Sequence, residues 1–217
     1  MAGHTVPPGG RTRRFGQIDK KMGMALTGIP LYGFLVVHLA GNLLLLKRDG
    51  GAAFEAYAAL LAGQPLLVPA ELGLLAVFFL HLYLAVSVTV ENWRARPVSY
   101  QRRRSAGGRT WASSTMIYSG VLVLAFLALH LANFKYGERG AGTLYDLVVD
   151  SFRSPLYGGG YVLAMVVLGF HLWHALHSAL QTLGLHASRR VRVVSAIFSL
   201  ILAGGFAAIP LWLVFAA

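Results

Sequence analysis

Four of the eight histidines stand in separate apolar stretches of the chain: His38, His81, His130 and His171. The 217 residues include no cysteine, so thiolate metal sites and iron–sulfur ligation are excluded and imidazole is the main metal-binding group. A neutral imidazole donates one nitrogen lone pair, and a haem iron can take two such axial ligands. One histidine in an apolar stretch is more often an interhelical hydrogen-bonding group, but four together favour two haem groups.

These histidines need elements to position them, and the composition predicts membrane helices. The chain is 56% hydrophobic and 12% charged, too few polar residues to cover a soluble core. We expect an all-α membrane protein with a polar segment at 1–22 and one haem-binding domain at 23–217, whose first four spans bundle around two haems. We expect five transmembrane helices at about 23–46, 66–92, 112–134, 156–184 and 191–216. Each has the roughly 20 apolar residues that a bilayer requires.

The basic residues predict the orientation of these spans. The net charge is +11, but Lys and Arg lie in short stretches between apolar runs, which favours membrane topology over nucleic-acid binding. Fourteen of them fall on the N-terminal side of the bundle and five on the other. The N-terminus is therefore expected in the cytoplasm and the C-terminus outside, in a multi-pass protein of the cell inner (cytoplasmic) membrane. The excess of basic residues on the inner face has two explanations: it sets the membrane topology alone, or it also provides a docking surface for a soluble partner.

Depth along the spans suggests how the four histidines pair. Counted from the cytoplasmic helix ends at about 1.5 Å per residue, His38 and His130 lie roughly 22 and 27 Å deep, whereas His81 and His171 lie at roughly 18–20 Å. The first and third spans would then hold an outer haem through His38 and His130. The second and fourth would hold an inner haem through His81 and His171.

An internal repeat gives the same pairing. Gly28 precedes His38 by ten residues, Gly120 precedes His130 by ten, and Leu-Ala follows both histidines. The next histidine of each half follows 43 and 41 residues later. Two such hairpins indicate a pseudo-twofold axis that makes the first span equivalent to the third and the second to the fourth. Both glycines would let a porphyrin approach the backbone, or else allow tight helix packing.

Four further side chains are candidates for ligand, quinone or proton chemistry. His174 is the main rival of His171 as an iron ligand, since successive members of His171-x-x-His174-x-x-His177 step around the helix by about 60°. His174 and His177 can also serve a quinone, a proton path or interhelical hydrogen bonds. Glu71, at the outer mouth of the second span, and Glu55, in the first outer loop, are proton-delivery candidates or solvated charges.

Taken together, the segments around the histidines resemble a known family. Over about residues 20–216 the chain resembles the cytochrome b membrane anchor of succinate:quinone oxidoreductases (succinate dehydrogenase and the related fumarate reductases), of the single-chain, five-helix, two-haem type. No single matching segment is specific to this family, but the ordered set of segments is fairly specific. The segments are Thr27-Gly28-Ile29-Pro30 to His38, Phe79-Leu80-His81, Ala128-Leu129-His130, Ser154-Pro155-Leu156, and Phe170-His171 with Gly184 thirteen residues after it.

This resemblance implies a function. It assigns His38 and His130 to the outer b haem and His81 and His171 to the inner one. It also implies an iron–sulfur subunit and a flavoprotein on the cytoplasmic side, with electrons passing through both haems to menaquinone or ubiquinone. The alternatives are a cytochrome b anchor of another quinone-linked dehydrogenase, a proton-coupled transporter with intramembrane histidines, and a purely structural anchor.

Overall fold

The computed structural model describes residues 16–94, 111–138, 140–185 and 188–216, and every element in this part of the chain is a helix. The five long helices are α1 (Gln17–Asn42), α3 (Leu67–Arg94), α4 (Trp111–His130), α6 (Pro155–Thr182) and α7 (Arg189–Ala216). Each contains a segment long and apolar enough to cross a membrane. The prediction of five candidate membrane-spanning helices is confirmed. The basic residues before position 16 and at 95–110, on which much of the predicted orientation depends, lie outside the described residues.

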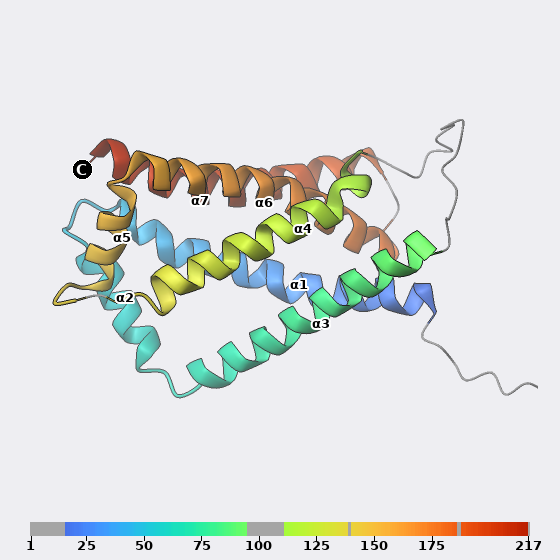
Figure 1. Cartoon of the computed structure of the whole chain (residues 1–217), viewed down its shortest axis with the longest axis horizontal. Helices are drawn as coiled ribbons and strands as arrows, with labels where there is room; N and C mark the ends of the chain where they lie inside the picture. The colour runs from blue at the N-terminus through green and yellow to red at the C-terminus, as the bar shows by residue number, and fades with distance from the viewer. Residues whose placement is uncertain (1–15, 95–110, 139, 186–187, 217) are drawn as a thin grey trace, which may run out of the picture.

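The long helices run back and forth along the longest axis of the molecule (Figure 1). The start of α1 lies at one end and the end of α7 at the other. Helix α1 packs against α3, α6 and α7, α4 packs against α6, and the most extensive interface joins α6 to α7. By contrast, α3 and α4 barely touch one another. The bundle is therefore a firm α1–α6–α7 core with α3 and α4 attached to separate sides.

Two short helices, which the sequence analysis leaves as loops, close the end of the bundle where α7 finishes (Figure 1). Helix α2 (Ala52–Ala62) follows Gly51, and α5 (Leu144–Phe152) begins at a capping box formed by Thr143 and Asp146. The carboxylate of Glu55 in α2 accepts a hydrogen bond from the Tyr145 backbone N–H of α5 at 2.6 Å. This bond satisfies one of the free N–H groups at the start of α5 and joins the two short helices.

Helix α1 starts at Gln17, six residues before the expected start at 23. The Asp19 carboxylate accepts a hydrogen bond from the Gly16 N–H at 3.0 Å, which caps the first turn. One turn further, the Lys20 ammonium donates to Ser87 Oγ of α3 at 2.7 Å and forms an ion pair with Glu91. Because its charge is paired across the α1–α3 interface, this polar stretch joins the helix.

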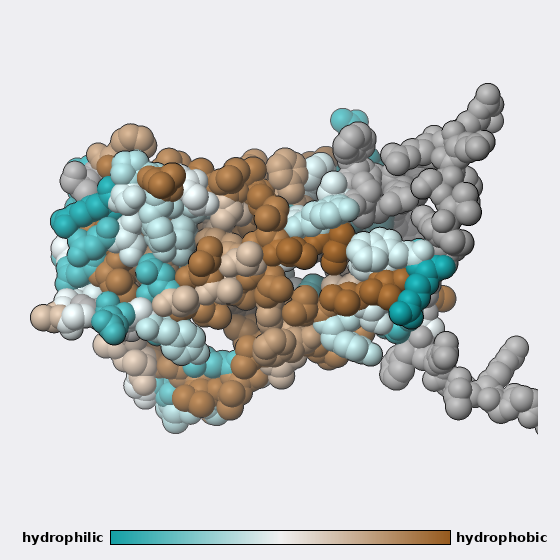
Figure 2. All heavy atoms as spheres, viewed as in Figure 1, coloured by the Kyte–Doolittle hydropathy of each residue, from teal (hydrophilic) through white to brown (hydrophobic). Residues whose placement is uncertain are grey.

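The buried apolar side chains gather between α1, α6 and α7, where Leu39, Leu168 and Leu202 are each less than 8% exposed. Apolar side chains also cover the outside of the middle of the molecule, while hydrophilic ones gather at the end with α2 and α5 (Figure 2). Helix α3 buries Val88 alone, and no residue of the described part of α4 is buried. Helices α3 and α4 therefore contact the rest of the bundle mainly through half-buried side chains, among them Val123 and Phe126 of α4.

Candidate functional site

His38 on α1 and His130 on α4 face each other near the end closed by α2 and α5. Their ring centres are 5.9 Å apart and their planes are nearly perpendicular, at 89°. An imidazole nitrogen bonds a metal at about 2 Å, so two imidazoles on opposite sides of one iron place their ring centres roughly 6 Å apart. The observed separation therefore fits two axial ligands of one haem iron.

Aromatic side chains surround this pair. Phe34 stacks on His38 at 5.2 Å between ring centres, and Phe206 of α7 lies 5.8 Å from the same ring. On the other side, Phe126 and Phe134 lie 5.8 and 5.4 Å from His130. Aromatic rings at these distances exclude water and supply the apolar walls that suit a large flat cofactor.

His81 on α3 is held by a hydroxyl group of α1. Thr27 Oγ1 lies 3.0 Å from His81 Nδ1 and 2.8 Å from the Gly23 carbonyl oxygen. Oγ1 is also 3.2 Å from the Met24 carbonyl oxygen. Where the single hydroxyl hydrogen goes to one of these two carbonyls, Oγ1 accepts from the histidine. His81 is then protonated at Nδ1, and the lone pair of Nε2 is available to a metal.

His171 on α6 repeats this arrangement against α4. Ser119 Oγ lies 3.1 Å from His171 Nδ1 and donates to the Met116 carbonyl oxygen at 3.0 Å. The same reasoning leaves the Nε2 lone pair of His171 free. A second set of imidazoles, each with a free Nε2 lone pair, thus comes from α3 and α6.

The two repeat glycines lie beside these rings. A Cβ atom placed on Gly28 would stand 3.6 Å from Cε1 of His81, and one on Gly120 would stand 3.5 Å from Cε1 of His171. At these distances a methyl group would make ordinary van der Waals contact with the ring. The contacts place each repeat glycine beside the histidine of the neighbouring helix.

The two pairs occupy separate levels of the bundle. Thr27, which contacts His81, precedes His38 by eleven residues, and Ser119 likewise precedes His130 by eleven. At 1.5 Å per residue the levels are about 16 Å apart along the helix axis. The depths counted from the sequence give a smaller gap, because that count starts α1 too late.

A haem iron needs only two ligands from the protein, and pairs of histidines are what the structure offers. Among the described residues, no three His, Asp or Glu side chains gather as a metal cluster. The donor set therefore fits a cofactor that brings its own equatorial ligands, such as a porphyrin.

The four secondary candidates lie elsewhere. Glu55 is engaged with the start of α5, and Glu71 forms an ion pair with Lys135 on the α4 side of the same end of the bundle. His174 is half-buried one turn beyond His171. His177 lies one turn further, with Nε2 3.1 Å from Gln181 Nε2 and a buried Nδ1 without a partner in the described chain. Neither glutamate contacts the histidine pairs.

Comparison with known proteins gives one informative match. This chain is similar to the succinate dehydrogenase cytochrome b558 subunit of Bacillus subtilis (strain 168). The two are 24% identical over 200 residues, which cover 89% of this chain and 91% of that protein. No family model matches the chain, and no solved structure matches it. The similarity covers most of the chain, and with the apolar character of the five long helices it supports a multi-pass membrane protein.

Thr27 and Ser119 are the site residues that the sequence analysis misses. Each stands immediately before a repeat glycine. The available signal is therefore a Ser-Gly or Thr-Gly dipeptide, in which the hydroxyl residue precedes a histidine by eleven residues and the glycine precedes it by ten. A hydroxyl side chain in a membrane helix usually bonds its own backbone, which hides such a role until the opposite helix is placed.

Proposed function

We propose that this chain is the membrane anchor and electron-transfer subunit of a succinate dehydrogenase (succinate:quinone oxidoreductase), passing electrons from an iron–sulfur subunit through two b haems to a membrane quinone. The observation that carries the proposal is the pair of neighbouring imidazoles of His38 on α1 and His130 on α4. The hydroxyl-held imidazoles of His81 on α3 and His171 on α6 support it. The similarity to a succinate dehydrogenase cytochrome b558 subunit supports the choice of enzyme.

In this proposal His38 and His130 hold the outer haem, and His81 and His171 hold the inner one. Bound haem supplies one-electron redox chemistry, which no side chain of this chain offers. The hydroxyls of α1 and α4 fix the ring orientation and tautomer of the inner pair, and a ligand whose Nδ1–H is bonded is a stronger electron donor. The aromatic rings around the outer pair exclude water from it.

The soluble partners, an iron–sulfur subunit and a flavoprotein, would bind on the cytoplasmic side, where α1 begins and α6 ends. Electrons would then reach the inner pair before the outer pair. The acceptor is menaquinone or ubiquinone, whose apolar ring needs an apolar site with one or two hydrogen-bond donors. Of the proton candidates, Glu55 and Glu71 are already held by structural partners, whereas His177 keeps a free ring nitrogen.

Replacement of His171 by Tyr tests the ligand assignment. We expect the variant to lose one of two haems per chain, with the remaining haem unchanged in the dithionite-reduced minus oxidised spectrum. His177→Tyr is the matched control, because it places the same residue two turns further along the same helix, and it should keep both haems. Two intact haems in His171→Tyr would instead assign the ligand to His174.

The complex itself is tested by purifying the chain from native membranes under mild conditions. A copurifying flavoprotein with succinate-dependent quinone reduction is the expected result. Haem with a different dehydrogenase would reject succinate as the substrate, and a colourless preparation would reject electron transfer and favour a transporter.

A further inference from the structure

A pocket of about 450 Å³ lies at the end of the bundle closed by α5, and none of the four histidines lines it. Its walls come from the chain after α1, from α5 and from the end of α7, namely Leu45, Lys47, Arg48, Gly50, Tyr145, Val149, Trp212, Leu213 and Phe215. The first apolar span ends at Leu46 and the last at Phe215. The pocket is therefore at the depth where lipid headgroups meet the hydrocarbon, a level at which Trp, Tyr and basic residues are typical.

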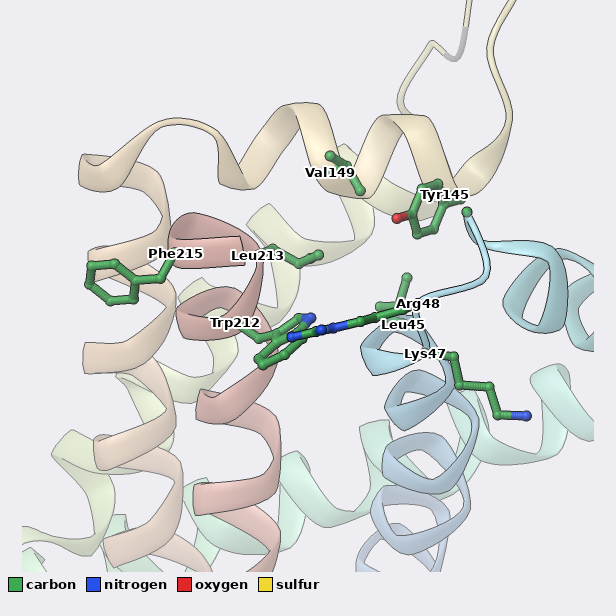
Figure 3. Close-up of a pocket in the computed structure, with 9 residues that line it drawn as sticks. Leu45, Lys47, Arg48, Tyr145, Val149, Trp212, Leu213 and Phe215 are labelled. Carbon is green, nitrogen blue, oxygen red and sulfur yellow. The ribbon is translucent and has the colours of Figure 1, made fainter. Parts of the chain in front are cut away.

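One cation faces this pocket. The Arg48 guanidinium carbon lies over the Trp212 ring, 5.3 Å from its centre, and the two side chains meet at the pocket (Figure 3). This cation–π contact favours the position of the side chain and leaves its N–H groups free to bind an anion. The Tyr145 hydroxyl points into the same space, whereas the Lys47 side chain points away from it (Figure 3).

Nearby carboxylates do not neutralise this charge. Asp49 accepts hydrogen bonds from backbone N–H groups at the start of α2, at 3.1 Å each, and Glu55 accepts from the Tyr145 N–H. Within the described chain, neither Lys47 nor Arg48 forms an ion pair. The pocket therefore combines an unpaired guanidinium, a phenol hydroxyl and an apolar floor.

We propose that this pocket binds the headgroup of an anionic phospholipid. The phosphate would accept hydrogen bonds from Arg48 and Tyr145, with Lys47 adding a nearby positive charge. The glycerol and first acyl carbons would lie against the apolar side chains of Leu213 and Phe215. A phosphate matches the planar guanidinium fork, and a phospholipid places its phosphate at this depth.

Titration of the full chain, purified in detergent with its haems, tests the proposal. The probes are dioctanoyl phosphatidylglycerol, dioctanoyl phosphatidylcholine and inorganic phosphate. We expect phosphatidylglycerol to bind more tightly than either, and Arg48→Gln to weaken it by about fivefold or more. Arg153→Gln is the matched control: it removes the same charge at the same end of the bundle, but Arg153 pairs with Asp150 outside the pocket. It should leave the affinity unchanged.

Tyr145→Phe keeps the test decisive if Arg48→Gln impairs folding. It removes one hydroxyl, should leave the haem spectrum intact, and should weaken phosphatidylglycerol binding by a few-fold. Equal affinity for the two lipids would overturn the proposal, as would equal effects of Arg48→Gln and Arg153→Gln. Inorganic phosphate binding as tightly as the lipid would also overturn it, by showing a free-anion site.

Discussion

The hydroxyl of Thr27 is expected to hold the imidazole of His81 in the state that binds iron. Thr27 Oγ1 is 3.0 Å from His81 Nδ1 and gives its own hydrogen to the Gly23 carbonyl oxygen. Thr27→Val keeps the shape of the side chain and removes the oxygen. The Nδ1–H group of His81 would then lose the hydroxyl oxygen as its acceptor and face a methyl group at that position.

The size of the effect follows from the lost bond. A buried donor left without a partner costs about 1–3 kcal/mol, which weakens binding through this ligand about 5- to 150-fold. That range overlaps the 10- to 100-fold loss usual for removal of a hydrogen-bond partner of a metal-binding histidine. Where the haem is retained, its reduction potential should rise, because an imidazole without this bond stabilises oxidised iron less. At about 59 mV per factor of ten for one electron, a two- to tenfold smaller preference of this ligand for oxidised over reduced iron gives a rise of roughly 20–60 mV.

The assay is a redox titration of the purified chain followed in the visible spectrum. Thr27→Val should change one haem only, the same one that His171→Tyr removes. Thr27→Ser should behave as wild type because it restores the hydroxyl. Thr89→Val is the matched control, since the Thr89 hydroxyl bonds only the Ala85 carbonyl oxygen of its own helix. Identical potentials and occupancies in Thr27→Val and Thr89→Val would refute the reasoning.

Three other predictions concern the second site and the end of the bundle. Ser119→Ala should affect the same inner haem as Thr27→Val, because its hydroxyl holds the other ligand of that pair; an effect on the outer haem alone would contradict this. Gly51→Ala should lower the free energy of unfolding by about 2–5 kcal/mol in thermal unfolding, because a Cβ at φ +86° is strained and would also overlap Tyr145. Gly50→Ala, at φ +66° with open space around it, should cost only about 1–2 kcal/mol; equal losses would show that the Tyr145 contact is unimportant. Asp146 accepts the N-cap N–H of α5, which lowers its pKa below the ordinary 3.8. Its contribution to stability is therefore complete above that value and lost as the pH falls through the lowered pKa, so Asp146→Asn should flatten the decrease in melting temperature below about pH 4.

The spans could be predicted because their signal is local. A run of about 20 apolar residues identifies a membrane helix without reference to any other part of the chain. The early start of α1 could not be predicted, since Lys20 enters the helix through partners on α3. Helices α2 and α5 are too short to span, and α2 begins directly after the Gly50-Gly51 pair that marks a loop in the sequence. Their docking depends on a bond between Glu55 and the backbone of Tyr145, 90 residues away.

The candidate site could be predicted in part. The repeat of Gly28 and His38 in Gly120 and His130 predicts which helices are equivalent, and the structure brings the rings of His38 and His130 to 5.9 Å of one another. Their role as iron ligands stays a prediction, as does the orientation in the membrane. The hydroxyl groups of Thr27 and Ser119, which contact histidines of the neighbouring helices, could not be found from the hydropathy pattern, because one serine or threonine hardly changes the hydropathy of a span.

Eleven residues are nearly three turns of an α-helix, so Thr27 and His38 lie on the same face of α1, and Ser119 and His130 lie on the same face of α4. Each of these helices can therefore receive a histidine of its partner helix at one level and present its own histidine at another, about 16 Å away. One residue inserted between Thr27 and His38 would leave composition and hydropathy almost unchanged. It would turn one of the two side chains about 100° away from the shared face, because each residue advances the helix by that angle. Two sites on one pair of helices thus depend on the spacing within each repeat, which explains why both halves of the chain keep the same eleven-residue interval.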